Sequence, residues 1–250
     1  MDSSAAAPMS KNRPCGKLEA RALKDRQSVV LVVLFRQNGR ASLGSGFVIR
    51  SDKQANQSII LSCDHILGRV AATDRLYVRT MVAEGIEELP ASIIYQNFAM
   101  DVSILRVPGL LSVPPLHFAP NCLPGDHVMA VGYGHPIALD PNSPDTPFAG
   151  FNITRMPATS PGFVRPVGTI YKTTFNDVKL NHVSLDCVVI DGMSGGAVLS
   201  LNGVIGLIVS SRRGESFAVS CDTILQVLKH SIGLDLRVPM TMEQVINLIR

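Results

Sequence analysis

The sequence predicts an all-β protein built from many short strands joined by tight turns. Hydrophobic residues make up 46% of the 250 residues and charged residues only 17%, and the chain contains 20 glycines and 16 prolines. This composition is typical of a globular chain with frequent turns, and its length is enough for one large domain or two smaller ones to bury a core. Short apolar runs, each bounded by polar or glycine-containing turns, show the pattern of β-strands.

The first half of the chain predicts one helix followed by six strands. After a polar leader, Lys17–Arg26 predicts a short helix. Val29–Phe35 is rich in β-branched residues and ends at the turn Asn38-Gly39, so it predicts a buried strand. Further strands are predicted at Ser45–Arg50, Ser58–Ser62, Leu76–Val82, Ala91–Tyr95 and Val102–Val107. Six short strands in succession favour a barrel or a sandwich, because closing a sheet removes its exposed edges.

A proline-rich segment from Pro108 to Pro124 interrupts the strand pattern and predicts a linker, since prolines prevent regular strand pairing. A second series of strands is predicted at His127–Val131, Phe163–Tyr171, His182–Val189, Ala197–Leu201, Val204–Ser210 and Ser216–Val219. Pro136–Pro147 predicts a long exposed loop. Asp222 is expected to cap a helix at Thr223–His230, and the tail up to Arg250 predicts another short helix.

Charge and cysteine usage exclude several classes of protein. The formal net charge is +3 and the basic residues are spread along the chain, so nucleic acid and membrane partners are not predicted. The five cysteines include no Cys-x-x-Cys, which argues against a disulfide framework and a zinc site and favours a reducing compartment. The start of the chain lacks a signal-peptide pattern, and no apolar stretch approaches the length of a membrane span. We expect a soluble intracellular protein, cytoplasmic or nuclear, with import into an organelle left open.

The feature that carries most chemistry is the turn from Asp191 to Val198, which reads Asp-Gly-Met-Ser-Gly-Gly-Ala-Val. Such a turn exposes the Ser194 hydroxyl and directs the N–H groups of Gly192 and Ser194 at one spot, so a nucleophile and an oxyanion hole can come from one loop. A catalytic serine also needs a histidine base and a carboxylate that orients it. His65 follows an apolar strand where one helical turn would present it. Asp101 begins another strand in an otherwise apolar stretch, where an unpaired carboxylate would be costly.

The order His65, Asp101, Ser194 and the residues around them resemble the trypsin-fold serine proteases, most closely the HtrA (Deg, protease Do-like) branch. The resemblance covers about Val29 to His230. The segments that carry it are Gly44-Ser45-Gly46-Phe47-Val48-Ile49, Ser62-Cys63-Asp64-His65-Ile66-Leu67, Asp101-Val102-Ser103-Ile104-Leu105, Gly192-Met193-Ser194-Gly195-Gly196 and the run from Pro124 to Gly134.

The resemblance implies two perpendicular six-stranded antiparallel β-barrels with the site between them and a C-terminal helix. It implies a serine endopeptidase in which Ser194 is the nucleophile, His65 the base, Asp101 the orienting carboxylate, and the Gly192 and Ser194 N–H groups the oxyanion hole. Protein or peptide substrates are implied as partners, and trimer formation by analogy. The expected division is a polar, partly disordered leader (1–28), an N-terminal barrel (29–107), a linker (108–125), a C-terminal barrel (126–221), and a helix and tail (222–250).

Several positions depart from the family pattern. Met193 stands where the HtrA branch commonly has Asn and digestive proteases have Asp, which leaves open how the oxyanion loop is held. Asp191 replaces a usual proline, and its charge is expected to face water. The 20 residues after His230 are too few for the PDZ domain that HtrA proteins usually carry.

Substrate preference is predicted from the positions that line the primary pocket in the trypsin fold. Val188 would form its base, and Leu207, Ile208 and Val209 its wall, so we expect small or medium aliphatic P1 residues; the alternative is that the three strand residues are barrel core.

No cofactor or metal is predicted. The remaining histidines lack partners at metal-ligand spacing, and Cys63 is read as a buried packing residue. Two rivals to the protease stay open: a latent or non-catalytic trypsin-fold protein that acts as a binding module, and an esterase that uses the same triad.

Overall fold

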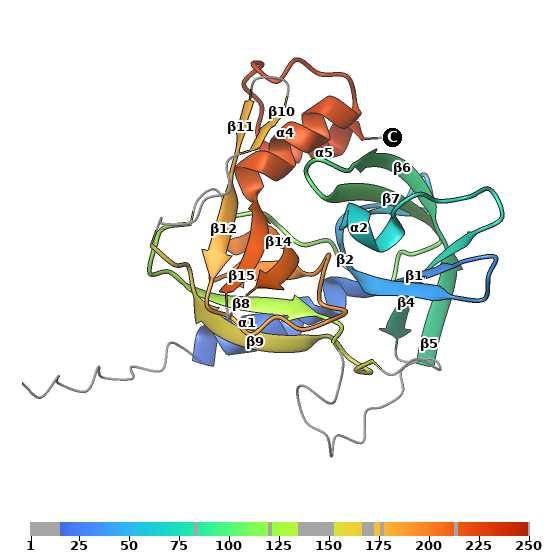
Figure 1. Cartoon of the computed structure of the whole chain (residues 1–250), viewed down its shortest axis with the longest axis horizontal. Coiled ribbons are helices and arrows are strands. Elements are labelled where there is room, and N and C mark those ends of the chain that lie inside the picture. Colours follow the sequence, from blue (N-terminus) through green and yellow to red (C-terminus); the bar gives the residue numbers. More distant parts are fainter. Residues whose placement is uncertain are drawn as a thin grey trace, which may run out of the picture.

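The computed structural model of the chain describes residues 16–82, 85–119, 122–134, 153–166, 173–175, 178–212 and 215–249. Two antiparallel β-sheets form the centre of the structure and lie side by side, as Figure 1 shows. Residues 1–15 of the predicted leader and the predicted loop Pro136–Pro147 lie outside the described residues.

The first sheet has seven strands, in the order β5-β4-β1-β2-β3-β7-β6. Its two edge strands, β5 and β6, are consecutive in the chain and are joined by the single residue Ala91. The sheet therefore curls until its two edges lie close together. The strands are β1 (Val29–Phe35), β2 (Ala41–Asp52), β3 (Gln57–Ser62), β4 (Arg75–Val82), β5 (Gly85–Pro90), β6 (Ser92–Asn97) and β7 (Val102–Pro108). Strand β5 is the one that the sequence patterns did not predict. It contains two glutamates and ends in proline, which are residues that strands disfavour.

The second sheet has six strands, in the order β12-β15-β14-β13-β8-β9. Its edges are brought together by the bridge between Val164 and Leu185, and the Arg165 N–H donates to the Ser184 carbonyl at 2.8 Å. The strands are β8 (His127–Gly132), β9 (Ala158–Phe163), β12 (His182–Leu185), β13 (Ala197–Ser200), β14 (Gly203–Arg212) and β15 (Glu215–Ser220), and a separate hairpin consists of β10 (Thr173–Phe175) and β11 (Val178–Leu180). The strand predicted at Phe163–Tyr171 does not start where expected, because β9 ends at Phe163, and its part from residue 167 to 171 lies outside the described residues.

The helices lie on the outside of the two sheets (Figure 1). The helix α1 (Gly16–Asp25) continues into the short 3-10 turn η1 (Arg26–Ser28), α2 (Asp64–Leu67) follows β3, and α4 (Cys221–Ser231) and α5 (Met242–Leu248) end the described chain. Ser220, rather than the predicted Asp222, caps α4, because its side chain accepts the Thr223 N–H. Arg50 on β2 donates to the carbonyls of Asn247 at 3.1 Å and Ile249 at 2.6 Å, and this holds the end of α5 against the first sheet.

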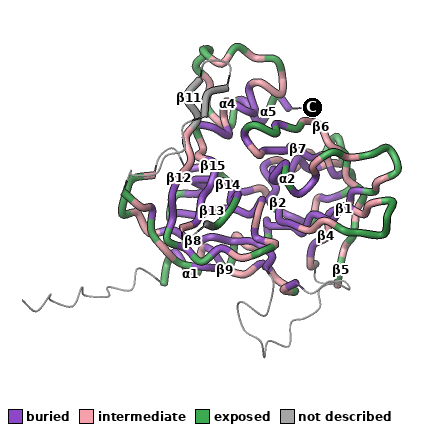
Figure 2. The backbone as a smooth tube through the Cα atoms, viewed as in Figure 1, coloured by how far each residue is buried: buried purple, intermediate pink, exposed green. Residues whose placement is uncertain are grey.

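One apolar core runs through both sheets and fixes their relative position. The larger cluster of buried side chains contains Val32 and Phe47 from the first sheet together with Met129 and Leu207 from the second. Figure 2 shows much of the buried backbone in the strands of the two sheets. Because burial of apolar area is the main stabilising term in folding, a shared core makes the seam between the sheets a rigid place to build a site.

These strands and helices match the predicted fold class. The fold is all-β with two antiparallel sheets and C-terminal helices, as expected, although the first sheet has seven strands and not six.

Candidate active site at the seam of the two sheets

His65 lies on α2, the single helical turn that follows β3. Gly68, with φ +53°, ends this turn, and its N–H bonds the Asp64 carbonyl at 2.7 Å. The neighbouring Asp64 is buried, and its carboxylate accepts a hydrogen bond from Gln96 at 2.7 Å. The side chain of His65 stays about half exposed. The short helix therefore presents the imidazole at the surface, as the sequence predicts.

Asp101 uses both of its carboxylate oxygens on His65. Oδ2 lies 2.6 Å from the ring Nδ1, and Oδ1 accepts the His65 backbone N–H at 2.7 Å. The two contacts fix the ring with Nδ1 toward the carboxylate, which leaves Nε2 on the opposite side. The hydrogen bond from Asp101 raises the pKa of His65 above its ordinary value, although partial burial of the ring opposes this shift.

Asp101 occupies a strained position on the hairpin between β6 and β7. Its φ is +54°, a left-handed conformation that residues other than glycine rarely adopt. The hairpin is held by Asn97, whose Oδ1 accepts the Met100 N–H at 3.1 Å, and the Asn97 amide donates to the Tyr95 hydroxyl at 3.2 Å. Strain of this kind persists only where surrounding contacts enforce it, and such positions gather at functional sites.

Ser194 lies on the loop between β12 and β13. Ile190 to Met193 form a turn in which the Met193 N–H donates to the Ile190 carbonyl at 3.0 Å and Gly192 has φ +94°. Positive φ at the third residue is the type II pattern, which glycine favours. Gly195 also has positive φ, and a Cβ built there would lie 1.9 Å from the Ser45 carbonyl oxygen. These two glycines let the loop turn sharply and touch the first sheet.

The loop leaves two N–H groups available. Those of Met193, Gly195 and Gly196 donate to the carbonyls of Ile190, Ile208 and Met193, at 3.0, 2.7 and 2.9 Å. Within the part of the chain that the structure describes, the N–H groups of Gly192 and Ser194 donate to no acceptor. Two unpaired donors on either side of Met193 are what an anion or a developing oxyanion requires.

Met193 contributes packing to this loop. Its side chain is fully buried in the core of the second sheet. Gly132 and Gly134 lie against it, since a Cβ on Gly132 would approach the Met193 backbone to 2.9 Å. Asp191 is exposed, in line with the expectation that its charge faces water. An apolar anchor thus stands where the family pattern has a polar residue.

The loops of His65 and Ser194 meet at one carbonyl. The Ile208 oxygen accepts a hydrogen bond from Cys63 Sγ at 3.1 Å and from the Gly195 N–H at 2.7 Å. Cys63 is two residues before His65, and Gly195 directly follows Ser194, so the shared acceptor places the two loops side by side. The Ser194 hydroxyl itself donates to the Val209 carbonyl at 3.2 Å, and no hydrogen bond joins it to His65 among the described residues.

Cys63 is the buried neighbour of this group. Potential ligand atoms of Cys63, His65 and Asp101 lie within 4.8 Å of one another. The thiol is fully buried and already bonded to Ile208, burial raises its pKa well above the ordinary value, and the Nδ1 atom of His65 is taken by Asp101. These features suit packing behind the His65–Asp101 pair and leave no open set of metal ligands.

The predicted specificity residues do not form one accessible wall. Leu207 and Ile208 have no exposed surface and pack into two different core clusters, which favours the alternative that these residues of β14 are barrel core. Val209 is also buried, with its carbonyl bonded to Ser194. Val188 is 64% exposed, and its N–H donates to Ser160 Oγ at 2.9 Å. Every residue of β14 from Gly203 to Val209 is buried, so both faces of this part of the strand are covered.

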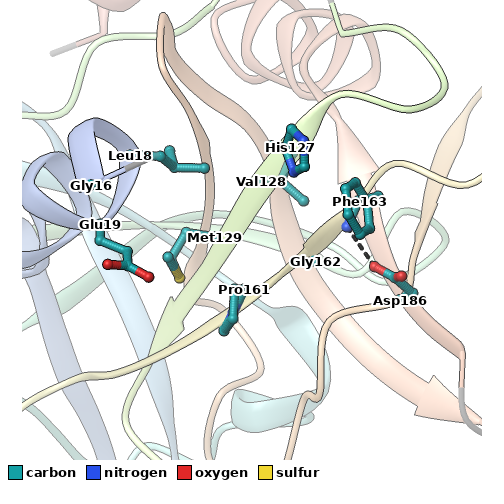
Figure 3. A pocket seen from close by; sticks show the side chains of 10 residues that line it. All are labelled: Gly16, Leu18, Glu19, His127, Val128, Met129, Pro161, Gly162, Phe163 and Asp186. Atoms are coloured by element: carbon teal, nitrogen blue, oxygen red, sulfur yellow. Dashed lines mark hydrogen bonds between the residues drawn. The ribbon is translucent and has the colours of Figure 1, made fainter. Parts of the chain in front are cut away.

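A cavity of about 790 Å³ lies elsewhere, between α1 and the pair β8–β9 (Figure 3). Leu18 and Glu19 of α1 face it from one side. The rings of His127 and Phe163, tilted against each other with centroids 4.4 Å apart, face it from the other. None of its lining residues belongs to the group around His65 and Ser194.

Comparison with known proteins identifies the family. A family model described as a trypsin-like peptidase domain matches residues 44–207. A probable periplasmic serine endoprotease, DegP-like, of Pseudomonas putida strain W619 is 29% identical over 200 residues, and that of strain GB-1 is 28% identical over the same length. Each match covers 77% of this chain and 35% of the relative, so the chain spans about a third of the length of these relatives.

Solved structures agree with the fold. The active form of the Rv3671c protease of M. tuberculosis superposes with a TM-score of 0.63 and 21% identity over 89% of this chain and 88% of that chain. Its inactive form gives 0.60 over 85% and 93%. The resemblance to HtrA/Deg trypsin-fold proteases that the sequence predicts is therefore confirmed.

The location of the protein stays a prediction. The curated relatives are named as periplasmic, which does not favour the expected cytoplasmic or nuclear compartment. In the described ranges, no helix has the length and apolar character needed to cross a membrane.

The family model matches well over half of the chain, and the solved structures share its fold. The chain belongs to the trypsin-like peptidase domain family.

Proposed function

We propose that this chain is a serine endopeptidase that hydrolyses peptide bonds of protein substrates through an acyl-enzyme. Ser194 acts as the nucleophile, His65 as general base and then acid, and Asp101 as the group that orients His65. The observation that carries the proposal is the double hydrogen bond between Asp101 and His65, because it leaves Nε2 as the nitrogen for proton transfer.

The reaction begins when the Ser194 hydroxyl turns from the Val209 carbonyl to the Nε2 atom of His65. In this rotation the hydroxyl exchanges its hydrogen bond to the Val209 carbonyl for one to Nε2. Because a neutral hydrogen bond contributes only about 1 kcal/mol net, the exchange costs little free energy. As Oγ attacks the substrate carbonyl carbon, its proton passes to Nε2 and the carbonyl electron pair moves to the oxygen. The N–H groups of Gly192 and Ser194 then donate to this oxyanion.

The intermediate collapses when His65 gives its proton to the leaving amine and the carbon–nitrogen bond breaks. The acyl group stays on Ser194 until a water molecule, which gives a proton to His65, attacks the acyl carbon. The bond between this carbon and Oγ then breaks, the acid leaves, and His65 returns the proton to Oγ. Because the same two N–H groups serve both tetrahedral intermediates, removing one such donor is expected to slow the reaction about 100- to 1,000-fold.

The surroundings of the site favour an extended, apolar substrate. Val209 lies at a bulge in β14 and has no partner on β15, so its carbonyl can accept a substrate N–H once Ser194 turns away. Val188 offers no charge to a basic P1 side chain. Phe98, on the hairpin three residues before Asp101, is 87% exposed and adds apolar surface beside the site. We therefore keep aliphatic P1 residues as the expected preference.

A latent binding module is the second candidate, and one observation favours it. Ser194 is bonded to Val209 and not to His65 in the described chain. If that bond persists with a substrate present, the protein would hold peptides without cleaving them.

Side-by-side assays of casein, a peptide library and small esters test the proposal. We expect wild-type protein to cleave casein and peptides after aliphatic residues, and the Ser194→Ala variant to cleave neither. Turnover of esters alone would support an esterase, and peptide binding without turnover would support the latent module. Either result would contradict the endopeptidase.

The pH dependence should report the state of His65. The base must be neutral, so kcat/KM should rise with pH and level off above the pKa of His65. The Asp101 hydrogen bond raises this pKa, so the midpoint should lie above the reference value of about 6.5. Initial rates measured from pH 5 to 9 at low substrate concentration check this, and a rate that falls through the same range would contradict the assignment of His65.

A further inference from the structure

We propose that Ser45, on β2 of the first sheet, is the positioning residue that holds the Gly192–Ser194 loop of the second sheet in its donor geometry. The proposal rests on the proposed function, because it concerns the loop assigned to the oxyanion. Ser45 is not in contact with the reacting atoms; it acts through the backbone of the loop.

All polar groups of Ser45 are engaged, although the residue is fully buried. Its hydroxyl donates to the Gly192 carbonyl at 2.8 Å and accepts the Tyr133 N–H at 2.8 Å. Its N–H donates to the Ser194 carbonyl at 2.7 Å, and its carbonyl accepts the Ser62 hydroxyl at 2.7 Å. One serine thus bonds the two residues whose N–H groups are available.

The glycines around Ser45 let the first sheet touch both halves of the site. A Cβ on Gly44 would lie 2.2 Å from Cδ1 of Ile66, the residue after His65 on α2. A Cβ on Gly195 would lie 1.9 Å from the Ser45 carbonyl oxygen. Backbone from β2 is therefore packed between the helix of His65 and the loop of Ser194, and it sets the spacing between them.

The loop needs such a contact because its glycines give it freedom to rearrange. Gly192 can adopt either sign of φ at little cost, so the turn that exposes its N–H is not enforced by its own residue type. Loss of the Ser45 hydroxyl would remove the donor to the Gly192 carbonyl and the acceptor of the Tyr133 N–H, both in buried surroundings. Unpaired buried groups drive the backbone to find new partners, and here that movement would displace the oxyanion donors.

The Ser45→Ala variant tests this role. We expect kcat for a peptide substrate to fall about 10- to 100-fold with KM nearly unchanged, since a donor displaced by about 1 Å loses that order of rate. The affinity for a peptide aldehyde, which forms the same oxyanion, should fall by a similar factor. The pH midpoint should not move, because the bonds between His65 and Asp101 are untouched.

Ser58→Ala is the matched control. Ser58 is also a fully buried serine of the first sheet, and its hydroxyl bonds the Leu110 carbonyl and Ser51 Oγ, away from the site. We expect a comparable loss of Tm with unchanged kcat. If the two variants lose kcat equally, or if Ser45→Ala changes KM alone, the positioning role is wrong.

Amide hydrogen exchange keeps this test separate from catalysis. Ser45→Ala should speed exchange at Tyr133 and Met193, whose N–H groups are bonded at this loop, but not at Gly68 on the far end of α2. Unchanged exchange at Tyr133 and Met193 would overturn the proposal. If the wild-type protein were inactive but Ser45→Ala still caused these exchange changes, the proposed function would be refuted and the positioning role of Ser45 would be confirmed.

Discussion

Replacing Ser194 by alanine should lower kcat for a peptide substrate by about a million-fold, down to the rate supplied by binding and the oxyanion donors alone. Among the described residues the hydroxyl makes one hydrogen bond, to the Val209 carbonyl, so its loss should hardly change the fold. Rates should be measured on purified protein with a fluorogenic peptide, and the Tm by thermal unfolding.

Ser200→Ala is the control for the Ser194 variant. Ser200 is a buried serine on β13 of the same sheet, and its hydroxyl bonds the Gly203 carbonyl at 3.1 Å. It should keep full activity. Cleavage by Ser194→Ala at more than a few per cent of the wild-type rate would show that another residue is the nucleophile.

Replacing Asp101 by asparagine should lower kcat about 10,000-fold. An amide has a single acceptor oxygen, so it cannot accept both the His65 N–H and the Nδ1–H, and the ring loses the tautomer that leaves Nε2 free to take a proton. Asparagine tolerates the φ of +54° found here, so the hairpin should persist. The pH midpoint of the remaining activity should also lie lower than in the wild type, because the hydrogen bond that raises the pKa of His65 is lost.

Asp64→Asn is the matched control for Asp101. Asp64 is the other carboxylate beside His65, it is buried, and it accepts from Gln96. Its replacement should change kcat less than about 10-fold, since it is not bonded to the ring. If the two variants lost activity equally, Asp101 would not be the orienting carboxylate.

The sequence predicts the fold and the candidate site residues where local patterns are strong. The β-branched run of β1 and the break from β3 into α2 appear as expected, because hydrophobic periodicity and turn residues act locally. Strand β5 escapes prediction because its glutamates and proline resemble a loop, and pairing with β4 decides its structure.

Two features depend on contacts between residues that are distant in the sequence: the wall of the primary substrate pocket, and the positioning of the Gly192–Ser194 loop by Ser45. Leu207 and Ile208 match a pocket by their position, yet the packing of two sheets buries both. The role of Ser45 needs the second sheet to bring Gly192 within 2.8 Å, and the φ of Asp101 needs the Asn97 hairpin. Nothing local to these residues in the sequence reports such contacts.

The most direct test of the account is to react the wild-type protein with a fluorophosphonate and to locate the adduct by mass spectrometry. This reagent forms a covalent bond only with a hydroxyl that a base has activated beside an oxyanion hole. We predict one adduct, on Ser194, that is lost in Ser194→Ala and strongly reduced in a His65→Ala variant. A folded wild-type protein that stays unlabelled, or that is labelled on a different residue, would contradict the account.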